Sequence, residues 1–437
     1  MNNFRHLKNV LNYNIRKMSE CSSIFCENPD KDFTRDRILT FEKTVRNVIC
    51  MGTGSLKDEL LQLHFHSTET PTASAFIQAR DKIKVEAFKL LFDRFNDKTH
   101  IDKLYKGYRL LAIDGSELPI DNTILDKETT LIKKNKIKNM SYCAYHITAS
   151  YDLVENTYDD LIIQGEAEMD ENMAFIQLVD RYKGKKSIFI ADRYFESYNG
   201  FEHVAHSGNK YLIRVKDIDS KTSMTRSFGP YPQGEFDIDV CRVLTLKQNK
   251  MIKACPHFYR FFPKNVHFDY MNKENPFYEF KSRVVRFKIT EDTYECIMTN
   301  LDRNEFSIED IKELYNKRWG IETSFRELKY AIGLNALHSK KRKLIRQEIY
   351  AKVLLYNFCQ RIIQEVKIPK NEKRVHKYQI NFTRAFHILR EFLTKKGGIN
   401  PPVEDLIAKE ILPIRPGRSS TRNVQSKKFV CFNYRYD

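Results

Sequence analysis

The chain has 437 residues, enough for two or three domains and a large core. Its 74 lysines and arginines outnumber its 57 aspartates and glutamates, and the formal charge of +17 indicates a polyanionic partner, nucleic acid before an anionic membrane surface. It lacks the apolar runs of a membrane span or a signal peptide, and its nine cysteines show no paired spacing. We therefore expect a cytoplasmic protein without membrane segments or a disulfide framework.

Residues 1–105 show the apolar spacing of helices. Ser55 with Asp58 is expected to begin one helix, and Thr72 to begin the next. The second helix carries a polar face made of Ser74, Gln78, Arg80 and Lys82. Such a face suits entry into a DNA major groove, but a plain helical bundle explains it equally well. We expect a helical region that binds the ends of a DNA element.

Residues 106–216 change to alternating strand and helix patterns. Apolar strands are expected at 109–113, 142–151, 158–163, 187–191 and 211–215, with helices at 172–182 and 198–205. A basic loop follows the first strand, with Lys127, Lys133, Lys134, Lys136 and Lys138. This order predicts a mixed α/β layer.

Residues 217–300 are rich in aromatic and β-branched runs and predict an all-β insertion. Residues 301–366 return to helical periodicity and are expected to complete the α/β core. The remainder, 367–437, predicts a helical region with a proline-containing linker and a basic tail. The tail carries Arg415, Arg418, Arg422, Lys427 and Lys428.

One helix is expected from Ser307, which forms a capping box with Asp310, to Gly333. An apolar strip on it contains Leu314, Ile321, Phe325, Leu328 and Ile332, and the neighbouring strip contains Tyr315, Arg318, Glu322 and Lys329. Gly320 marks a break or a close approach. A surface ion pair between Arg318 and Glu322 is the simpler interpretation of the polar strip.

Asp114 and Asp192 each follow an apolar strand, at the sheet edge where ligand sites gather in α/β folds. Taken singly, such aspartates usually stabilise turns. Together with Glu322 they form three like charges that need a cation. Mg²⁺ or Mn²⁺ suits such oxygen ligands, and two ions would clamp an in-line displacement at phosphorus.

Asp114-Gly-Ser, Ala191-Asp192-Arg193 and the pattern Tyr315-x2-Arg318-x3-Glu322-x6-Lys329 together resemble the DDE transposases of the insertion-sequence-four family. The resemblance covers roughly residues 108–360. It implies an α/β fold, with a ribonuclease-H-like mixed-sheet catalytic core over 106–216 and 301–366. This core holds the all-β insertion of 217–300 and lies between helical N-terminal and C-terminal regions.

The resemblance also implies roles for single residues. Asp114, Asp192 and Glu322 correspond to the catalytic, metal-binding carboxylates, and Tyr315, Arg318 and Lys329 to contacts with DNA phosphate. Arg193 and Lys216 are further candidates for phosphate contacts. Two departures from the family pattern are Tyr194, where glycine is common, and the absence of tryptophan from the insertion, since Trp319 is the only one in the chain.

The implied activity is cleavage at the ends of an insertion sequence and joining of the 3′-hydroxyl ends to target DNA, with Mg²⁺ or Mn²⁺. The implied partners are duplex DNA, as terminal inverted repeats and target, and a second copy of the chain on paired ends, in a bacterial cytoplasm at the nucleoid. Two alternatives remain open: a ribonuclease-H-like nuclease without strand transfer, and a non-catalytic DNA-binding remnant.

Overall fold

The computed structural model describes residues 3–414, apart from 36, 135–138, 264–265, 292, 370–373, 375 and 396–401. Its strands are β1 (Arg109–Ile120), β2 (Thr130–Lys134), β3 (Asn139–Asp152), β4 (Thr157–Gly165), β5 (Ser187–Ala191), β6 (Lys210–Val215), β7 (Phe236–Thr245), β8 (Tyr259–Phe261), β9 (Phe277–Thr290), β10 (Thr293–Thr299), β11 (Tyr378–Ile380) and β12 (Ile411–Pro413). Ten of them form one sheet in the order β2-β3-β1-β5-β6-β10-β9-β7-β8, with β4 beside β3.

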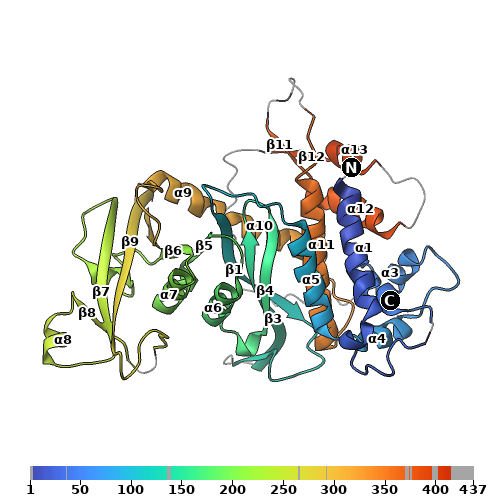
Figure 1. Ribbon diagram of the computed structural model, residues 1–437, viewed down its shortest axis with the longest axis horizontal. Helices are drawn as coiled ribbons and strands as arrows, with labels where there is room; N and C mark the ends of the chain where they lie inside the picture. The colour runs from blue at the N-terminus through green and yellow to red at the C-terminus, as the bar shows by residue number, and fades with distance from the viewer. Residues whose placement is uncertain are drawn as a thin grey trace.

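The helices are α1 (Asn3–Glu20), α2 (Phe41–Cys50), α3 (Leu56–Leu63), α4 (Ala73–Asp81), α5 (Val85–Thr99), α6 (Glu171–Arg181), α7 (Tyr198–His206), α8 (Lys250–Ala254), α9 (Ile308–Lys317), α10 (Trp319–Arg326), α11 (Arg342–Ile363), α12 (Phe382–Thr394) and α13 (Val403–Lys409). Figure 1 shows α1–α5 gathered with α11–α13 at one end of the molecule and the sheet extending to the other. β1, β5 and β6 are parallel, whereas the flanking strands are antiparallel. The predicted mixed α/β fold, with helical regions in the N-terminal and C-terminal parts of the chain, is therefore confirmed.

The apolar run at the start of β1 is buried on both faces of the sheet. Leu111 and Ile113 pack in the same cluster as residues of α6 and α7, whereas Leu110 packs with Leu314 of α9. Alternate side chains of a strand point to opposite faces. Asp114 therefore belongs to the face that α9 covers, the face of Leu110.

Two of the N-terminal helices, α3 and α4, begin where the sequence predicted. The side chain of Ser55 accepts a hydrogen bond from the N–H of Asp58, and that of Thr72 from the N–H of Ala75. Ser74 and Gln78 are exposed on α4, but Arg80 is fully buried and pairs with Glu348 of α11 at 2.8 Å. The expectation that Arg80 belongs to an exposed polar face is therefore wrong. Its guanidinium is removed from water and is stabilised by the carboxylate of Glu348, which is distant in the sequence.

The region 217–300 continues the central sheet. β10 pairs with β6, β9 with β10, and β7 with β9, so its strands add directly to those of 106–216. It also contains the short helix α8, which corrects the expectation of purely β structure. The lysine-rich segment predicted as a loop forms β2 against β3, while Lys136 and Lys138 lie outside the described residues.

The C-terminal part contains a small two-stranded antiparallel sheet that was not predicted. β11 pairs with β12, which ends at Pro413, the first residue of the second proline-containing stretch expected to be a linker. α12 begins after Asn381, whose side chain caps it. The basic tail from Arg415 onward lies outside the described residues. Within the described ranges, no helix combines the length and the hydropathy needed to cross a bilayer.

Candidate active site

Two aspartates lie side by side at one edge of the parallel strands. Ile113 of β1 is in register with Ala191 of β5, so Asp114 and Asp192 take the next positions on neighbouring strands. Asp192 follows the end of β5, as predicted, and its side chain accepts a hydrogen bond from the N–H of Tyr194. Asp114 does not end its strand: β1 continues to Ile120 because its ladder with β3 extends past the point where pairing with β5 stops.

The glycine after Asp114 packs tightly against neighbouring side chains. A Cβ at Gly115 would overlap the carboxylate of Glu171 and the imidazole of His146. His146 is buried and forms ion pairs with Glu166 at 3.4 Å and Glu171 at 2.5 Å. This packed group fixes the backbone that carries Asp114.

The third carboxylate is on the helical segment that begins at Ser307. The predicted capping box with Asp310 is present, and the predicted apolar strip is buried. The segment is not one continuous α-helix, because α9 ends at Lys317, α10 follows from Trp319, and residues Glu327–Ala331 form a π-helical turn. A Cβ on Gly320 would lie 2.9 Å from Leu153, which confirms the close approach, and Gly333 ends the segment with φ of +87°.

Arg318 joins the helix to the sheet. Its Nη2 lies 2.9 Å from Oε1 of Glu322, and its Nη1 lies 3.9 Å from Oδ2 of Asp114. The side chain of Arg318 is only 6% exposed, and α10 packs against β1. The interpretation as a surface ion pair is therefore wrong: a buried guanidinium lies between two carboxylates from different elements.

The site holds more negative charge than its cation neutralises. Burial, with smaller contributions from the charges of Asp192 and Glu322, raises the pKa of Asp114 to about 7 against the opposing effects of the Gly115 N–H and Arg318. A carboxyl that is this costly to ionise gains stability from any additional cation. Strongly perturbed acids at a sheet edge are candidates for function.

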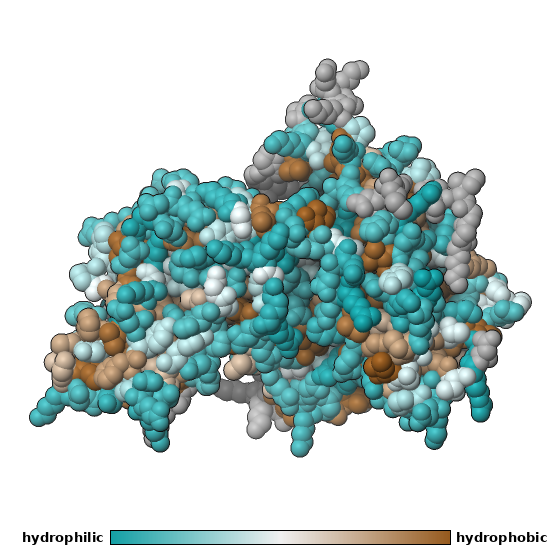
Figure 2. All heavy atoms as spheres, viewed as in Figure 1, coloured by the Kyte–Doolittle hydropathy of each residue, from teal (hydrophilic) through white to brown (hydrophobic). Residues whose placement is uncertain are grey.

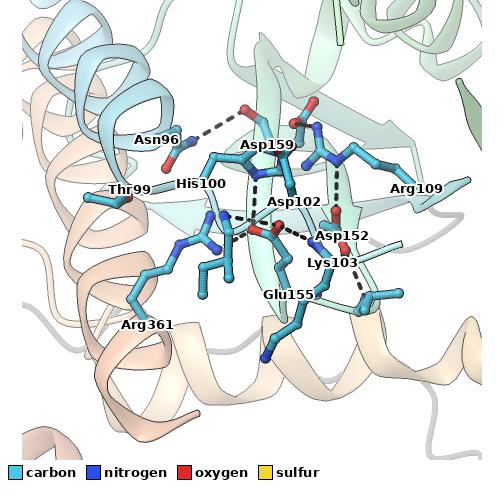
Figure 3. Close-up of polar contacts among 12 residues, drawn as sticks. Asn96, Thr99, His100, Asp102, Lys103, Arg109, Asp152, Glu155, Asp159 and Arg361 are labelled. Carbon is cyan, nitrogen blue, oxygen red and sulfur yellow. Dashed lines mark hydrogen bonds and ion pairs between the residues drawn. The ribbon is translucent and has the colours of Figure 1, made fainter. Parts of the chain in front are cut away.

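In a second group of buried acids, the stabilising effect of neighbouring cations outweighs the cost of burying the charge. In Figure 3, Glu155 lies among His100, Lys103 and Arg361, at the junction of the helical end and the sheet. Despite burial, the pKa of Glu155 is lowered to about 2, because His100 and Arg361 stabilise its charge. In the same cluster Asp152 accepts a hydrogen bond from Arg109 at 2.8 Å. These acids are neutralised by protein cations and hold the fold together.

The donor set around Asp114 fits a hard divalent ion in its chemistry, because carboxylate oxygens are the ligands that Mg²⁺ and Mn²⁺ take. The positions do not yet converge on one point. Among the residues that the structure describes, no three histidine, cysteine or acidic side chains lie close enough to hold one ion together. The guanidinium of Arg318 lies between two of the three carboxylates, those of Asp114 and Glu322.

The candidate phosphate contacts divide into two groups. Tyr315 is buried with its ring centroid 5.5 Å from the guanidinium of Arg318, and Lys329, in the π-helical turn, donates to the carbonyl oxygen of Glu117 on β1 at 2.6 Å. These two residues lie on the segment that carries Glu322. Arg193 is exposed next to Asp192, and Lys216 is half-buried at the end of β6.

The sequence did not single out Arg214 of β6, whose Nη1 lies 3.2 Å from Oε1 of Glu295 on β10. Both charges act on the pKa of Tyr315, which burial raises above its ordinary value. Arg214 lies two residues before Lys216 in an apolar strand, and this interrupted pattern was the available signal.

The comparisons with known proteins agree with the motif. The family model described as "Transposase DDE domain" matches residues 105–358. The transposase for insertion sequence element IS421 of Escherichia coli is 34% identical over 85 residues, 19% of this chain and 23% of that protein. Transposase InsG for insertion sequence element IS4 of Escherichia coli K12 is 28% identical over 102 residues, 23% of each chain. The matched segments thus span about a quarter of the length of these relatives.

Among solved structures, a cryo-EM structure of the piggyBac transposase synaptic complex with hairpin DNA aligns with 94% of this chain and 84% of its own. Its TM-score is 0.44 and its identity 11%, too low to support an argument. The family model, by contrast, covers more than half of the chain, including Asp114, Asp192 and Glu322. The chain belongs to the family of transposases with a DDE domain.

Proposed function

We propose that this protein is the transposase of an insertion sequence, which cuts DNA at the ends of the element and joins the 3′-hydroxyl ends to target DNA. The observation that carries the proposal is the trio Asp114, Asp192 and Glu322, placed by two adjacent strands and the helix packed on them, with too little positive charge among them. The family match and the names of the relatives, transposases of insertion sequences, supply the substrate class.

Members of this family generally use divalent metal ions. In this chain Asp114, Asp192 and Glu322 would hold them, and two Mg²⁺ or Mn²⁺ ions would neutralise charge on the attacking and leaving oxygens at phosphorus. The same ions would stabilise the ionised form of Asp114, whose pKa is raised by burial and, to a smaller degree, by the charges of Asp192 and Glu322. The ribonuclease-H-like arrangement of the core is part of this proposal.

Arg318 has two tasks in this account. Without DNA its guanidinium separates Glu322 from Asp114. When DNA and ions bind, it turns onto the phosphate at the cut, because its planar fork matches two phosphate oxygens. Tyr315 packs against it and orients it, while Lys329 supplies a point charge from the π-helical turn that follows α10.

The remaining cations would position the DNA around the cut. Arg193 and Lys216, at the ends of neighbouring elements, would contact backbone phosphates, which set position without reading sequence. We assign recognition of the terminal inverted repeats to residues 1–105, where Ser74 and Gln78 are exposed on α4. A homodimer would hold two ends together, at the nucleoid of a bacterial cell.

The experiment is an end-cleavage assay. The protein is incubated with Mg²⁺ and labelled duplex carrying the end of its element, and the products are mapped to the nucleotide. The proposal expects a 3′-hydroxyl at the element boundary and, with target plasmid added, joined products. Cleavage without joining would identify a nuclease, and binding without cleavage a non-catalytic DNA-binding protein; either result contradicts the proposal.

A further inference from the structure

The helical segment that carries Glu322 ends in an unusual turn. Residues Glu327–Ala331 form a π-helical turn, and the N–H of Ile332 donates to the carbonyl oxygen of Glu327 at 3.0 Å. Such turns are rare and occur frequently at functional sites. This one contains Lys329, a candidate phosphate contact. Whatever holds the turn in place therefore decides where the ammonium group of Lys329 lies.

Two side chains of the turn reach different neighbours. The Nζ of Lys329 donates to the carbonyl oxygen of Glu117 at 2.6 Å, on the strand β1 that also carries Asp114. The carboxylate of Glu327 reaches α11 instead, where its Oε2 accepts a hydrogen bond from the hydroxyl of Tyr356 at 3.0 Å. The turn is thus attached to α11 by one residue and to β1 by the other, and a shift at Glu327 would move Lys329.

The hydrogen bond to Glu327 belongs to a buried network. The Nε2 of Gln360 donates to the same carboxylate oxygen at 3.4 Å and to the hydroxyl of Tyr356 at 3.0 Å. The hydroxyl of Tyr151 on β3 lies 3.1 Å from that of Tyr356, and the rings of Tyr158 and Tyr356 are 5.1 Å apart. All three tyrosines are at most 2% exposed. Packing on several sides fixes the ring of Tyr356, so its hydroxyl meets Glu327 from a rigid position.

The apolar side chains of the turn are anchored in the interior as well. Leu328, Ala331 and Ile332 are buried, and the turn packs on α11 and α12. Figure 1 shows α11 where the sheet meets the helical end, and in Figure 2 hydrophilic side chains cover most of the face in view. The turn is held from beneath this surface, and half-buried Lys329 extends from it toward β1.

The simpler interpretation is that this network only stabilises the contact between the turn and α11. Burial raises the pKa of Glu327, against the opposing effects of the hydrogen bond from Tyr356 and the charge of Arg326. Burying a carboxylate costs free energy unless hydrogen bonds offset the cost, and an apolar side chain would fill this place without it. What the carboxylate adds is direction, because its hydrogen bonds specify one orientation of the turn.

We propose that Glu327 and Tyr356 are positioning residues for DNA cleavage, and that their hydrogen bond fixes the π-helical turn so that Lys329 meets the phosphate at the cut. The inference rests on the proposed function, because it takes this phosphate as the partner of Lys329. When DNA binds, the ammonium exchanges the carbonyl oxygen of Glu117 for a phosphate oxygen, a charged and therefore stronger acceptor. The exchange delivers the charge to the right place only if the turn itself does not move.

The test measures single-turnover cleavage of end DNA at saturating DNA, and separately the DNA concentration that gives half of the maximal rate. Tyr356→Phe removes the hydroxyl and keeps the ring. It should slow cleavage at saturation about tenfold or more, because a misplacement of about 1 Å can cost about 100-fold in rate. The half-saturating concentration should change less than about twofold, since phosphate contacts elsewhere position the DNA.

The matched control is Tyr350→Phe, which removes a hydroxyl from another buried tyrosine of α11. The phenol of Tyr350 is influenced by the charges of Asp93 and Asp160, away from the π-helical turn. This variant should keep both the wild-type rate and the wild-type half-saturating concentration.

A double variant separates positioning from stability. If Tyr356 acts through Lys329, Tyr356→Phe should cost less than about twofold in rate when Lys329→Ala is already present, whereas independent losses multiply. Wild-type cleavage by Tyr356→Phe would overturn the inference. So would a loss in the Lys329→Ala background as large as the loss in the wild-type background.

Glu327 provides the same test from the other side of the hydrogen bond, and it carries the test if Tyr356→Phe does not fold. Glu327→Gln keeps an oxygen that accepts from Tyr356 and should cut within about threefold of the wild-type rate. Glu327→Ala lacks the acceptor and should be slowed about tenfold or more. Equal rates in the two Glu327 variants would also overturn the inference.

The outcomes distinguish this inference from the proposed function. If the wild-type protein cuts end DNA and the Tyr356 and Glu327 variants cut equally well, the inference fails alone. If the wild-type protein neither binds nor cuts DNA, the proposed function fails and the inference fails with it.

Discussion

Replacing Asp114 by asparagine should stabilise the protein in the absence of metal while abolishing cleavage. Burial raises the pKa of this carboxyl from 3.8 to about 7, so the folded state takes up protons that the unfolded chain releases. At about 1.4 kcal/mol per pKa unit, ionised Asp114 destabilises the fold by up to about 4 kcal/mol. Relaxation around the partly exposed carboxyl lowers this limit, and we expect a gain of about 1–2 kcal/mol from Asp114→Asn.

The sign follows from proton linkage. Because the native state binds more protons than the unfolded state between about pH 4 and pH 7, the wild-type protein loses stability across this range as the pH rises. Asp114→Asn lacks this loss, so its advantage is largest above pH 7. Adding Mg²⁺ should stabilise the wild-type protein and leave the variant unchanged, since only an ion held by the native state shifts unfolding.

The assay is urea unfolding with a chelator at pH 5 and pH 8, and then with Mg²⁺. Asp152→Asn is the matched control, because Asp152 is a buried aspartate whose charge Arg109 neutralises at 2.8 Å. It should cost about 3 kcal/mol or more. If Asp114→Asn destabilises the protein as much as Asp152→Asn does, Asp114 is a structural acid paired with Arg318, and the reasoning is refuted.

Three further predictions follow from other contacts. Arg318→Ala should slow single-turnover cleavage about 10- to 100-fold, which corresponds to the loss of one charged hydrogen bond. The control Lys317→Ala, at an exposed position, should keep the wild-type rate. Equal rates in both variants would show that Arg318 is not part of the site. Arg361→Met leaves the buried carboxylate of Glu155 without its main cation and should cost about 3–5 kcal/mol in urea unfolding; a loss below about 1 kcal/mol would show that the cluster in Figure 3 does not stabilise the fold. Burial opposes the charge of His146, but ion pairs with two glutamates raise its pKa to about 9. The contribution of this charge to stability is therefore fully present below about pH 6.5 and is lost as the pH rises through about 9. His146→Gln should therefore be less stable than wild type at pH 6 and equal to it at pH 10, and a constant difference in urea unfolding would contradict this.

Local patterns were sufficient for the elements that position the carboxylates. The strand at 187–191 is apolar after Ser187, is buried along its whole length and ends directly before Asp192. The capping box at Ser307 and the apolar strip on α9 and α10 are local signals, and both are present. These features depend on residues close in sequence, which is why the sequence was enough.

Features that depend on distant partners could not be predicted. Arg80 was placed on an exposed face because its partner Glu348 lies on α11, far along the chain. The sequence does not predict β2, because its lysines interrupt the pattern typical of a strand. Only the pairing with β3 identifies it as a strand. Likewise, periodicity finds Arg318 and Glu322 on one face, but only the tertiary structure shows that Arg318 also reaches Asp114.

The central claim is that Asp114, Asp192 and Glu322 act together as the centre that cuts DNA. The most direct test compares single-turnover, Mg²⁺-dependent cleavage of end DNA by Glu322→Gln and by Glu313→Gln, which removes an exposed carboxylate from α9. Loss of residues that only support a metal ligand costs about 10- to 100-fold, so removing a ligand itself should cost more than about 100-fold. We expect Glu322→Gln to bind the end DNA and fail to produce the 3′-hydroxyl, and Glu313→Gln to cut like wild type. Cleavage by Glu322→Gln within about threefold of wild type would contradict the account.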